Sequence, residues 1–573
     1  MARVAQLINA STLVAEMGFN DLAGVNIVFI NMPLREAARP NTPPQGPGLM
    51  AARLRQYGAN VSIIDLNAYR ILDAVSKARG LASGRHYTHE EAERLIRAHF
   101  SKHGEPDLIG ISGKITTLKW QQWTARTCRE LVPDAFIISG GGLATEFKTG
   151  LFNWVRDLDA IGHSEGDDII LLAALDVKRY HEQRSRTTDS PYYLGEFGGR
   201  HRFMYEGGRP ADLDALPFAA WDLLETDVFG NTPLDWYIRT AVWGDLATNN
   251  SSAANFSMQR SLTTVSSRGC PHACRFCFRG AQGEQDWGIR SPENLRAEAE
   301  WLIRTYGVDF IGFPDDNFAV AVKRCQALPE AFRGLSFRWG THTRLDECTM
   351  DRLEPMAEAG CIYIGVGAES ASKETLTAMG KGGQILRKNG VERLTKWGGY
   401  EFPTMMMEGI ENCRQVGIHT NATWMMAYPG ETLKGLQTSI AFIEWQRQLY
   451  TQGLTRGTPK YALADRSVNK RLFTATWYPG TDMVEAPGAE KPRELLTKHF
   501  GITFKEVGVN RFKKFVPVAD EAMRYYVEEL DDATKVLHGT DGAPLNFSAM
   551  DDDTFLEARE HIDAGELDKV LAM

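Results

Sequence analysis

The chain has 573 residues, of which 24% are charged, and it carries a net charge of −9 with a pI near 5.9. This length suits about three domains, and the absence of a long lysine or arginine run argues against nucleic acid or an anionic membrane surface as the main partner. No apolar run reaches the ~18 residues of a membrane span, and the first residues do not form a secretory signal. We therefore expect a soluble, cytoplasmic protein.

The N-terminal region alternates short apolar strands with helices. The strands are expected within residues 25–33, 60–66, 107–112, 135–140 and 157–163. This alternation predicts an open, doubly wound α/β domain that binds its ligand in the crevice beyond the strand ends. The three glycines at 140–142 lack the Gly-x-Gly-x-x-Gly spacing, so a nicotinamide site is not favoured.

The eight cysteines are unevenly spread. Five of them, Cys128, Cys325, Cys348, Cys361 and Cys413, are well separated and are expected to be buried thiols. The other three lie within the stretch RGCPHACRFCFRG at 268–280, with the spacing Cys-x3-Cys-x2-Cys. A structural zinc site needs four ligands, and His272 lies too close in sequence to its neighbouring cysteines to complete one comfortably. A cubic iron–sulfur cluster held by three thiolates would instead leave one iron open to a small molecule.

After this loop come repeated pairs of helix and short strand. Residues 291–307 form an amphipathic helix with Ser291 as its N-cap, and 308–318 form a buried strand with polar residues at its end. Three further units follow, within residues 335–347, 350–370 and 416–432. Such repeats predict a parallel sheet, probably curled into a barrel or partial barrel, with ligand groups at the carboxyl ends of its strands.

The cysteine loop resembles the signature of radical SAM enzymes, Cys-x3-Cys-x-aromatic-Cys, with Cys270, Cys274, Phe276 and Cys277 in those places. The resemblance implies that the three cysteines are catalytic and hold a 4Fe-4S cluster, whose open iron binds S-adenosylmethionine (SAM) and whose electron cleaves it to a 5′-deoxyadenosyl radical. It also implies a partial (β/α)6 barrel over 255–485. The residues implied in SAM binding are Phe276, Asp315, Asp316, Asn317, Arg344, Gly367, Glu369, Tyr428 and Pro429.

The N-terminal half resembles the cobalamin-binding domain that precedes the barrel in cobalamin-dependent radical SAM enzymes. The similar pieces are Asn-x-Pro at 31–33, residues 44–55, Ile-Gly-Ile-Ser at 109–112, 139–145 and the turn 163–168. Because the Asp-x-His-x-x-Gly motif is absent, the resemblance implies base-off cobalamin with no protein histidine beneath the metal. The residues implied in cobalamin binding are Pro33, Ser112, Gly113, Lys114, Thr116, Gly140, Gly141, Gly142, Leu143 and Glu165.

The expected architecture is therefore α/β throughout, with four parts. These are a Rossmann-like cobalamin-binding domain (1–185), a linker with substrate-side loops (186–254), the radical SAM barrel (255–485) and a helical C-terminal cap (486–573). Residues 226–262 and 380–412 are long for their places and are expected to contact substrate.

The resemblance implies a C-methyltransferase that moves a methyl group from SAM through methylcobalamin to an unactivated carbon of a small molecule or peptide, as in natural product biosynthesis. An external electron donor would be needed, and a monomer is expected. The alternative within the family is an oxidative cyclase or ring-rearranging enzyme without methyl transfer. A zinc-stabilised binding module is a third reading, which leaves the barrel motifs unexplained.

Overall fold

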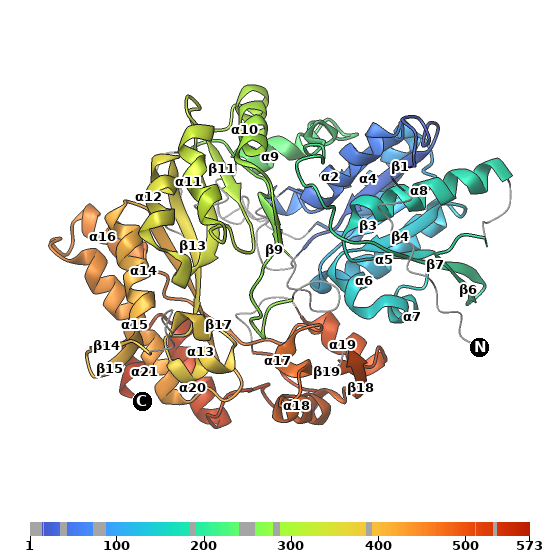
Figure 1. Ribbon diagram of the computed structural model, residues 1–573. Coiled ribbons are helices and arrows are strands. Elements are labelled where there is room, and N and C mark those ends of the chain that lie inside the picture. The colour runs from blue at the N-terminus through green and yellow to red at the C-terminus, as the bar shows by residue number, and fades with distance from the viewer. Residues whose placement is uncertain are drawn as a thin grey trace. The chain divides into compact units, whose positions relative to one another are not determined.

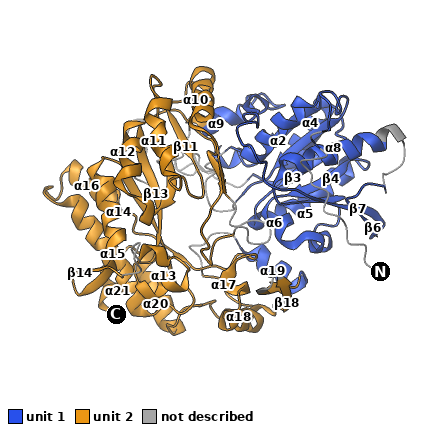
Figure 2. Cartoon of the chain, in the orientation of Figure 1, with its two compact units in different colours: residues 1–237, 280–282, 519–531 blue, residues 238–279, 283–518, 532–573 orange. Residues whose placement is uncertain are grey.

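The computed structural model describes residues 14, 16–34, 43–72, 87–183, 189–239, 258–278, 287–385, 392–509, 512–530 and 536–573. Two compact units are present (Figure 2): the first comprises 1–237, 280–282 and 519–531, and the second comprises 238–279, 283–518 and 532–573. Parts of the expected substrate loops, 240–257 and 386–391, lie outside the described residues. Among the described residues, no helix has both the length and the apolar character needed to cross a bilayer.

The first unit contains a seven-stranded sheet in the order β2-β1-β3-β4-β5-β7-β6, in which only β6 runs antiparallel to its neighbour (Figure 1). Its strands are β1 (Asn26–Asn31), β2 (Asn60–Asp65), β3 (Leu108–Ser112), β4 (Phe136–Gly140), β5 (Ala160–His163), β6 (Tyr193–Phe197) and β7 (Arg200–Glu206). Its helices are α2 (Gln45–Gln56), α4 (His89–His103), α5 (Leu118–Leu131), α6 (Gly142–Phe147), α7 (Leu151–Trp154), α8 (Gly166–Gln183) and α19 (Glu521–Glu529), and α9 (Pro233–Arg239) begins in it.

The strand order reverses direction at β1. The chain passes from β1 to β2 on one side of it and then back across to β3 on the other. Right-handed crossovers in opposite directions place the connecting helices on opposite faces, which is the doubly wound arrangement. The carboxyl ends of β1 and β3 therefore flank the switch point, where such sheets bind ligands.

The sequence analysis placed residues 186–254 in a linker, but 193–206 form a hairpin that extends this sheet. Strand β7 pairs with β5 in parallel, and β6 forms the edge. Two adjacent glycines, Gly198 and Gly199, have φ of +60° and +72° and make the turn between the strands. A hairpin attached to the last strand of an α/β unit is not visible in the helix–strand alternation that was used to set the boundary.

The second unit is built on a six-stranded, wholly parallel sheet in the order β17-β16-β13-β12-β11-β8. Its strands are β8 (Ser261–Thr263), β11 (Phe310–Phe313), β12 (Arg338–Arg344), β13 (Cys361–Glu369), β16 (His419–Met426) and β17 (Leu472–Thr474). Strands β8 and β17 are its two edges, so the sheet is the predicted half-barrel. The helices that alternate with the strands are α10 (Pro292–Tyr306), α11 (Val322–Ala331), α12 (Met350–Glu358), α13 (Lys373–Ala378), α14 (Thr404–Gln415) and α15 (Leu433–Thr451) (Figure 1).

Local sequence explains several of these boundaries. Helix α10 begins as predicted at Ser291, whose side chain accepts a hydrogen bond from the Asn294 amide, and it ends at Gly307 in the left-handed conformation. This is the usual combination of a serine N-cap with a glycine C-cap. The strands are held by large apolar side chains such as Trp339, Phe310 and Trp424, which are at most 1% exposed.

The C-terminal segment is helical as predicted but includes a hairpin. The helices are α16 (Pro459–Arg466), α17 (Asp482–Glu485), α18 (Glu490–Phe500), α20 (Asp552–Asp563) and α21 (Leu567–Ala572). Strands β18 (Phe504–Val509) and β19 (Phe512–Pro517) form the hairpin. The unit also has two short antiparallel pairs, β9 (Ser267–Gly269) with β10 (Trp287–Ile289) and β14 (Leu394–Trp397) with β15 (Tyr400–Pro403). The last of these lies in the long segment 380–412.

Candidate active site

The cysteine loop follows β9, close in sequence to the edge strand β8 of the half-barrel. Cys274 is buried, whereas Cys270 is partly exposed and Cys277 exposed. The loop is held by its own backbone, because the Cys277 amide donates to the Cys274 carbonyl at 3.2 Å and the Arg275 amide donates to the Met379 carbonyl at 2.9 Å. The second bond ties the loop to the end of α13. These amides fix the loop without using the sulfur atoms.

The environment of Cys274 favours a thiolate. The Arg344 Nη1 atom lies 3.3 Å from the Cys274 sulfur, and the remaining guanidinium nitrogens bind both Asp346 oxygens at 2.9 Å. A hydrogen bond from Cys277 and the positive charges of Lys381 and Arg344 lower the pKa of Cys274 to about 6. Iron is bound by thiolates rather than thiols, so this donor set suits an iron–sulfur cluster.

The three sulfurs do not converge on one point. In the described part of the chain, no three histidine, cysteine, aspartate or glutamate side chains come together closely enough to hold a single metal ion. Each thiolate of a cubic cluster binds a different iron, so the ligands of a cluster are spread more widely than those of a zinc ion. The three cysteines on one loop therefore fit a cluster better than a mononuclear site.

His272 is engaged by a carboxylate rather than lying with the thiols. Its Nε2 atom lies 2.8 Å from Glu347 Oε1, and Thr343 Oγ1 donates to Asn317 Oδ1 at 2.8 Å and lies 3.3 Å from Glu347 Oε2. The chain of contacts joins the cysteine loop to the carboxyl ends of β11 and β12. It also leaves Asn317 Nδ2 buried without a hydrogen-bond partner among the described residues. A buried amide of this kind has a donor available to a ligand.

The three polar residues after β11 have different surroundings. Asp315 is 2% exposed and accepts hydrogen bonds from the Ser266 amide at 2.8 Å, from the Ser266 hydroxyl, and from Ser267 Oγ at 2.7 Å. Its carboxylate therefore braces the segment that leads into the cysteine loop. Asp316 is exposed, and only Asn317 is both buried and incompletely bonded. Of the trio, Asn317 remains the best candidate for contact with SAM.

The carboxyl end of β13 is strained and closely packed. The Ser370 amide donates to the Ala368 carbonyl at 2.8 Å across Glu369, whose φ is +64°. This is a γ-turn with positive φ, a rare and costly conformation for a residue with a side chain. A Cβ atom on Gly367 would lie 2.7 Å from Glu369 Oε1 and 3.0 Å from Lys381 Nζ. The glycine is therefore required by the chain's own side chains.

The turn after β16 brings a tyrosine to the cysteine loop. The rings of Tyr428 and Phe276 meet edge to face with centroids 6.4 Å apart. The turn is stabilised by Glu431, whose Oε2 accepts from the Ala427 amide at 2.6 Å, and Ala427 has φ of +61°. Burial raises the pKa of Glu431 to about 8. Pro429 lies within the same turn, beside the aromatic residue that the resemblance assigns to the adenine.

In the first unit, the glycines implied in cobalamin binding lie at adjacent strand ends. A Cβ atom on Gly141, where φ is +88°, would lie 2.6 Å from the Gly113 carbonyl oxygen. The backbones after β3 and β4 therefore touch. By contrast, a Cβ atom on Gly140 or Gly142 would meet nothing within 4 Å. Bare backbone beside open space at the strand ends allows the close approach of a large flat ligand.

The loops after β1 and β3 are tied together at the switch point. Thr116 Oγ1 donates to the Leu34 carbonyl at 2.9 Å, next to the buried Pro33. The remaining residues of the set lie at neighbouring positions: Ser112 ends β3, Lys114 is exposed, Leu143 is buried in α6, and Glu165 precedes α8. The structure thus brings Pro33 and Thr116 together and gives Gly113 and Gly141 direct contact.

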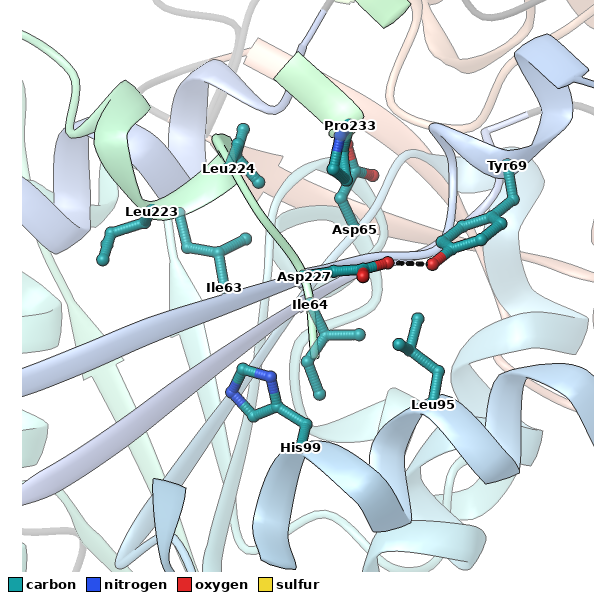
Figure 3. Close-up of a pocket in the computed structure, with 10 residues that line it drawn as sticks. All are labelled: Ile63, Ile64, Asp65, Tyr69, Leu95, His99, Leu223, Leu224, Asp227 and Pro233. Atoms are coloured by element: carbon teal, nitrogen blue, oxygen red, sulfur yellow. Dashed lines mark hydrogen bonds between the residues drawn. The ribbon is translucent and has the colours of Figure 1, made fainter. Parts of the chain in front are cut away.

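A small pocket lies at the far edge of this sheet, beyond β2 (Figure 3). Asp65, Tyr69, His99 and Asp227 contribute its polar groups, and Tyr69 donates a short hydrogen bond to Asp227. Its apolar walls are Ile63, Ile64, Leu95, Leu223, Leu224 and Pro233. None of the residues that the sequence analysis assigned to cobalamin lines it.

Sequence reasoning missed the charged residues that surround the cysteines. Asp346 and Glu347 were quoted only as part of a strand, and Lys381 carried no signal beyond its flanking glycines. Their importance comes from contacts over long sequence separations, such as the 75 residues between His272 and Glu347. No local pattern reports a pairing of that kind.

Comparison with known proteins agrees with this geometry. Residues 264–443 match the model of the Radical SAM superfamily. The chain is 24% identical to an uncharacterized methyltransferase of Pyrococcus horikoshii over 66% of this chain and 73% of that protein. It is 21% identical to the anaerobic magnesium-protoporphyrin IX monomethyl ester cyclase of Cereibacter sphaeroides, over 60% of this chain and only 50% of the cyclase.

Among solved structures, the radical SAM methyltransferase TsrM of Kitasatospora setae shares the fold. The structure with tryptophan and a SAM analogue superimposes with a TM-score of 0.58 at 14% identity, over 95% of this chain and 89% of TsrM. Another TsrM structure, with cobalamin and a [4Fe-4S] cluster bound, gives a TM-score of 0.55, also at 14% identity, over 94% of this chain and 90% of TsrM. With its cysteine loop, its half-barrel and these matches, the chain belongs to the radical SAM enzymes and shares the two-part fold of TsrM.

Proposed function

We propose that this enzyme is a cobalamin-dependent radical SAM methyltransferase that places a methyl group on a carbon of a small-molecule or peptide substrate. The observation that carries the proposal is the presence in one chain of a radical SAM loop and a doubly wound unit with bare glycine backbone at its strand ends. The relatives described above support it, since both the Pyrococcus protein and TsrM are named as methyltransferases.

When bound, the cluster and SAM would supply a carbon-centred radical, and cobalamin would supply a methyl group carried over from SAM. The protein's own residues hold, orient and shield these groups. Cys270, Cys274 and Cys277 would hold the cluster. Arg344 keeps its guanidinium against the Cys274 sulfur, and Asn317 keeps a buried donor available at the end of β11.

The aromatic and polar residues around the loop suit the nucleoside part of SAM. Phe276 and Tyr428 form an apolar wall, and Pro429 belongs to the same turn. Glu369 offers a carboxylate that could accept from a ribose hydroxyl, since its Oε2 is bonded only weakly, to Thr423 at 3.4 Å. Such fixed groups orient a bound substrate without further rearrangement.

In the first unit, cobalamin would be held base-off at the glycine loops after β3 and β4, with no protein histidine below the metal. The described histidine nearest to these loops along the sheet is His163 at the end of β5. Its Nδ1 lies 3.1 Å from the Thr145 carbonyl, and it is 4% exposed. The Thr145 contact and its burial suit a structural role for His163. An external one-electron donor, a monomeric state and a place in natural product biosynthesis complete the proposal.

The test begins with anaerobic reconstitution using iron, sulfide and cobalamin, followed by addition of SAM and reductant. Formation of both 5′-deoxyadenosine and S-adenosylhomocysteine, with corrinoid retained through gel filtration, is the expected result. Cys274→Ala should abolish 5′-deoxyadenosine while retaining corrinoid, because the glycine loops are untouched. Retained corrinoid with 5′-deoxyadenosine alone would instead favour a cyclase or ring-rearranging enzyme, the function to which the Cereibacter relative points.

A further inference from the structure

We propose that the buried ion pair of Lys381 and Glu369 sets the reduction potential of the cluster at the cysteine loop. Lys381 was not among the residues expected to bind a cofactor, and Glu369 was expected only to contact SAM. The inference rests on the cluster site alone. It is independent of methyl transfer and of cobalamin.

The fold delivers Lys381 to this place through the end of α13. The Gly380 amide donates to the Thr377 carbonyl at 3.1 Å, and the Lys381 amide donates to the Leu376 carbonyl at 2.8 Å. Together with φ of +74° at Gly380, these bonds form a Schellman motif, which turns the chain sharply at the helix end. A Cβ atom on Gly380 would lie 3.0 Å from the Ala273 carbonyl oxygen, so the turn packs directly on the cysteine loop.

The lysine head group is buried between the half-barrel and the loop. Lys381 is 3% exposed, and its Nζ donates to the Gly367 carbonyl at 2.7 Å and pairs with Glu369 Oε1 at 3.4 Å. The same atom lies 5.8 Å from the centroid of the Phe276 ring, next to Cys277 in the sequence. A lysine is seldom fully buried unless it is paired, and here the pairing fixes the charge beside the cluster ligands.

The other member of the pair is held in a strained conformation. Glu369 adopts positive φ at the end of β13, where the pairing register with β16 also shifts. Strain of this kind persists only where the surroundings impose it, and it concentrates at functional sites. Lys381 and Thr423 are the side chains that hold the carboxylate. The backbone distortion therefore places a negative charge opposite the lysine, close to the loop.

Two opposite charges beside a cluster act on its potential with opposite signs. Reduction adds one electron, taken from the external donor, and makes the cluster and its thiolates more negative by one charge without moving a proton. A buried cation stabilises the reduced form, and a buried anion destabilises it, because screening by water is weak there. Lys381 should therefore raise the potential and Glu369 should lower it.

The experiment measures the potential of the reconstituted cluster by anaerobic redox titration, followed by electron paramagnetic resonance, without SAM. Lys381→Met is expected to lower the equilibrium constant for reduction about tenfold, equivalent to 59 mV for a one-electron couple. Glu369→Gln is expected to raise it by a similar factor. The double variant should return to within about threefold of the wild type, since it removes both charges.

The chain provides a matched control on the same helix. Lys373 pairs with Glu392 at 2.5 Å, but both side chains are more than a third exposed. Lys373→Met should leave the potential unchanged, because exposed charges are screened. Lys381→Arg keeps the charge and should stay within about threefold of the wild type.

Opposite shifts from the two single variants would support the inference, since a general loosening of the site would move both potentials the same way. Shifts of the same sign, or unshifted potentials in variants that carry a full cluster, would overturn it. A wild-type protein that assembles no cluster would overturn the cluster assignment and this inference together. A cluster that assembles without methyl transfer would overturn only the proposed function.

Discussion

The carboxyl group of Glu431 should make the stability of the half-barrel depend on pH. It is 2% exposed, its Oε2 accepts from the Ala427 amide, and its Oε1 is buried without a hydrogen-bond partner in the described part of the chain. Burial raises its pKa to about 8, against hydrogen bonds from the Ala427 and Tyr428 region that act in the opposite direction. The folded protein therefore holds this proton more tightly than the unfolded chain does.

The sign and size of the effect follow from that difference. Because the folded pKa lies above the ordinary 4.5, the stabilisation is fully present below pH 4.5 and is lost as the pH rises towards 8. The whole difference corresponds to about 5 kcal/mol as an upper bound. Glu431→Gln keeps an acceptor for the Ala427 amide and cannot ionise. It should therefore remove this pH dependence and stabilise the half-barrel above pH 7 by about 3 kcal/mol.

Hydrogen exchange of the β16 amides (His419–Met426) would measure this effect within the right unit. The opening free energy, corrected for the intrinsic pH dependence of exchange, should fall between pH 5 and 9 in the wild type and change less in Glu431→Gln. Asp65→Asn lies in the other unit and serves as a control that should leave these amides unchanged. A variant that is less stable than the wild type at every pH, with the same slope, would refute the reasoning.

Three other predictions concern stability. Gly141→Ala forces a side chain into positive φ and against the Gly113 carbonyl; it should cost about 2 kcal/mol in urea unfolding of the first unit, whereas Gly142→Ala, beside open space, should be nearly neutral. Burial raises the pKa of Asp65 to about 6, so stability of the first unit should fall as the pH rises from about 4 to 6, and Asp65→Asn should abolish that fall; an unchanged slope would contradict it. Ser291→Ala removes the N-cap of α10 and should lower the free energy of unfolding of the second unit by about 1 kcal/mol, with Ser336→Ala, outside any helix or strand, as a neutral comparison.

The parts of the fold that follow from local pattern were predictable. The apolar strands and the capped helix at Ser291 are set by short-range preferences, and the three cysteines lie within eight residues of one another. What escaped prediction depends on distant pairing. Asp315 bonds to Ser266 across 49 residues, and the hairpin β6–β7 joins a sheet whose other strands end before it. Sequence spacing does not report which distant groups will neutralise each other.

The expected SAM residues illustrate the same limit. Position after a strand correctly indicated that Asp315, Asp316 and Asn317 lie together, but it could not show that one is saturated, one exposed and one incompletely bonded. The roles of Lys381 and Glu347 depend on how the ends of different elements meet. Those arrangements are determined by packing of the half-barrel as a whole.

The backbone bonds of the cysteine loop have a consequence for the life of the enzyme in air. They join Arg275 to Met379 and Cys277 to Cys274 through amides and carbonyls, none of which is an iron ligand. If oxygen destroys the cluster, these bonds remain and the loop keeps its course. The damaged enzyme can then receive new iron and sulfide without first refolding, unlike a zinc finger, which unfolds when its metal is removed. Repair becomes a matter of delivery.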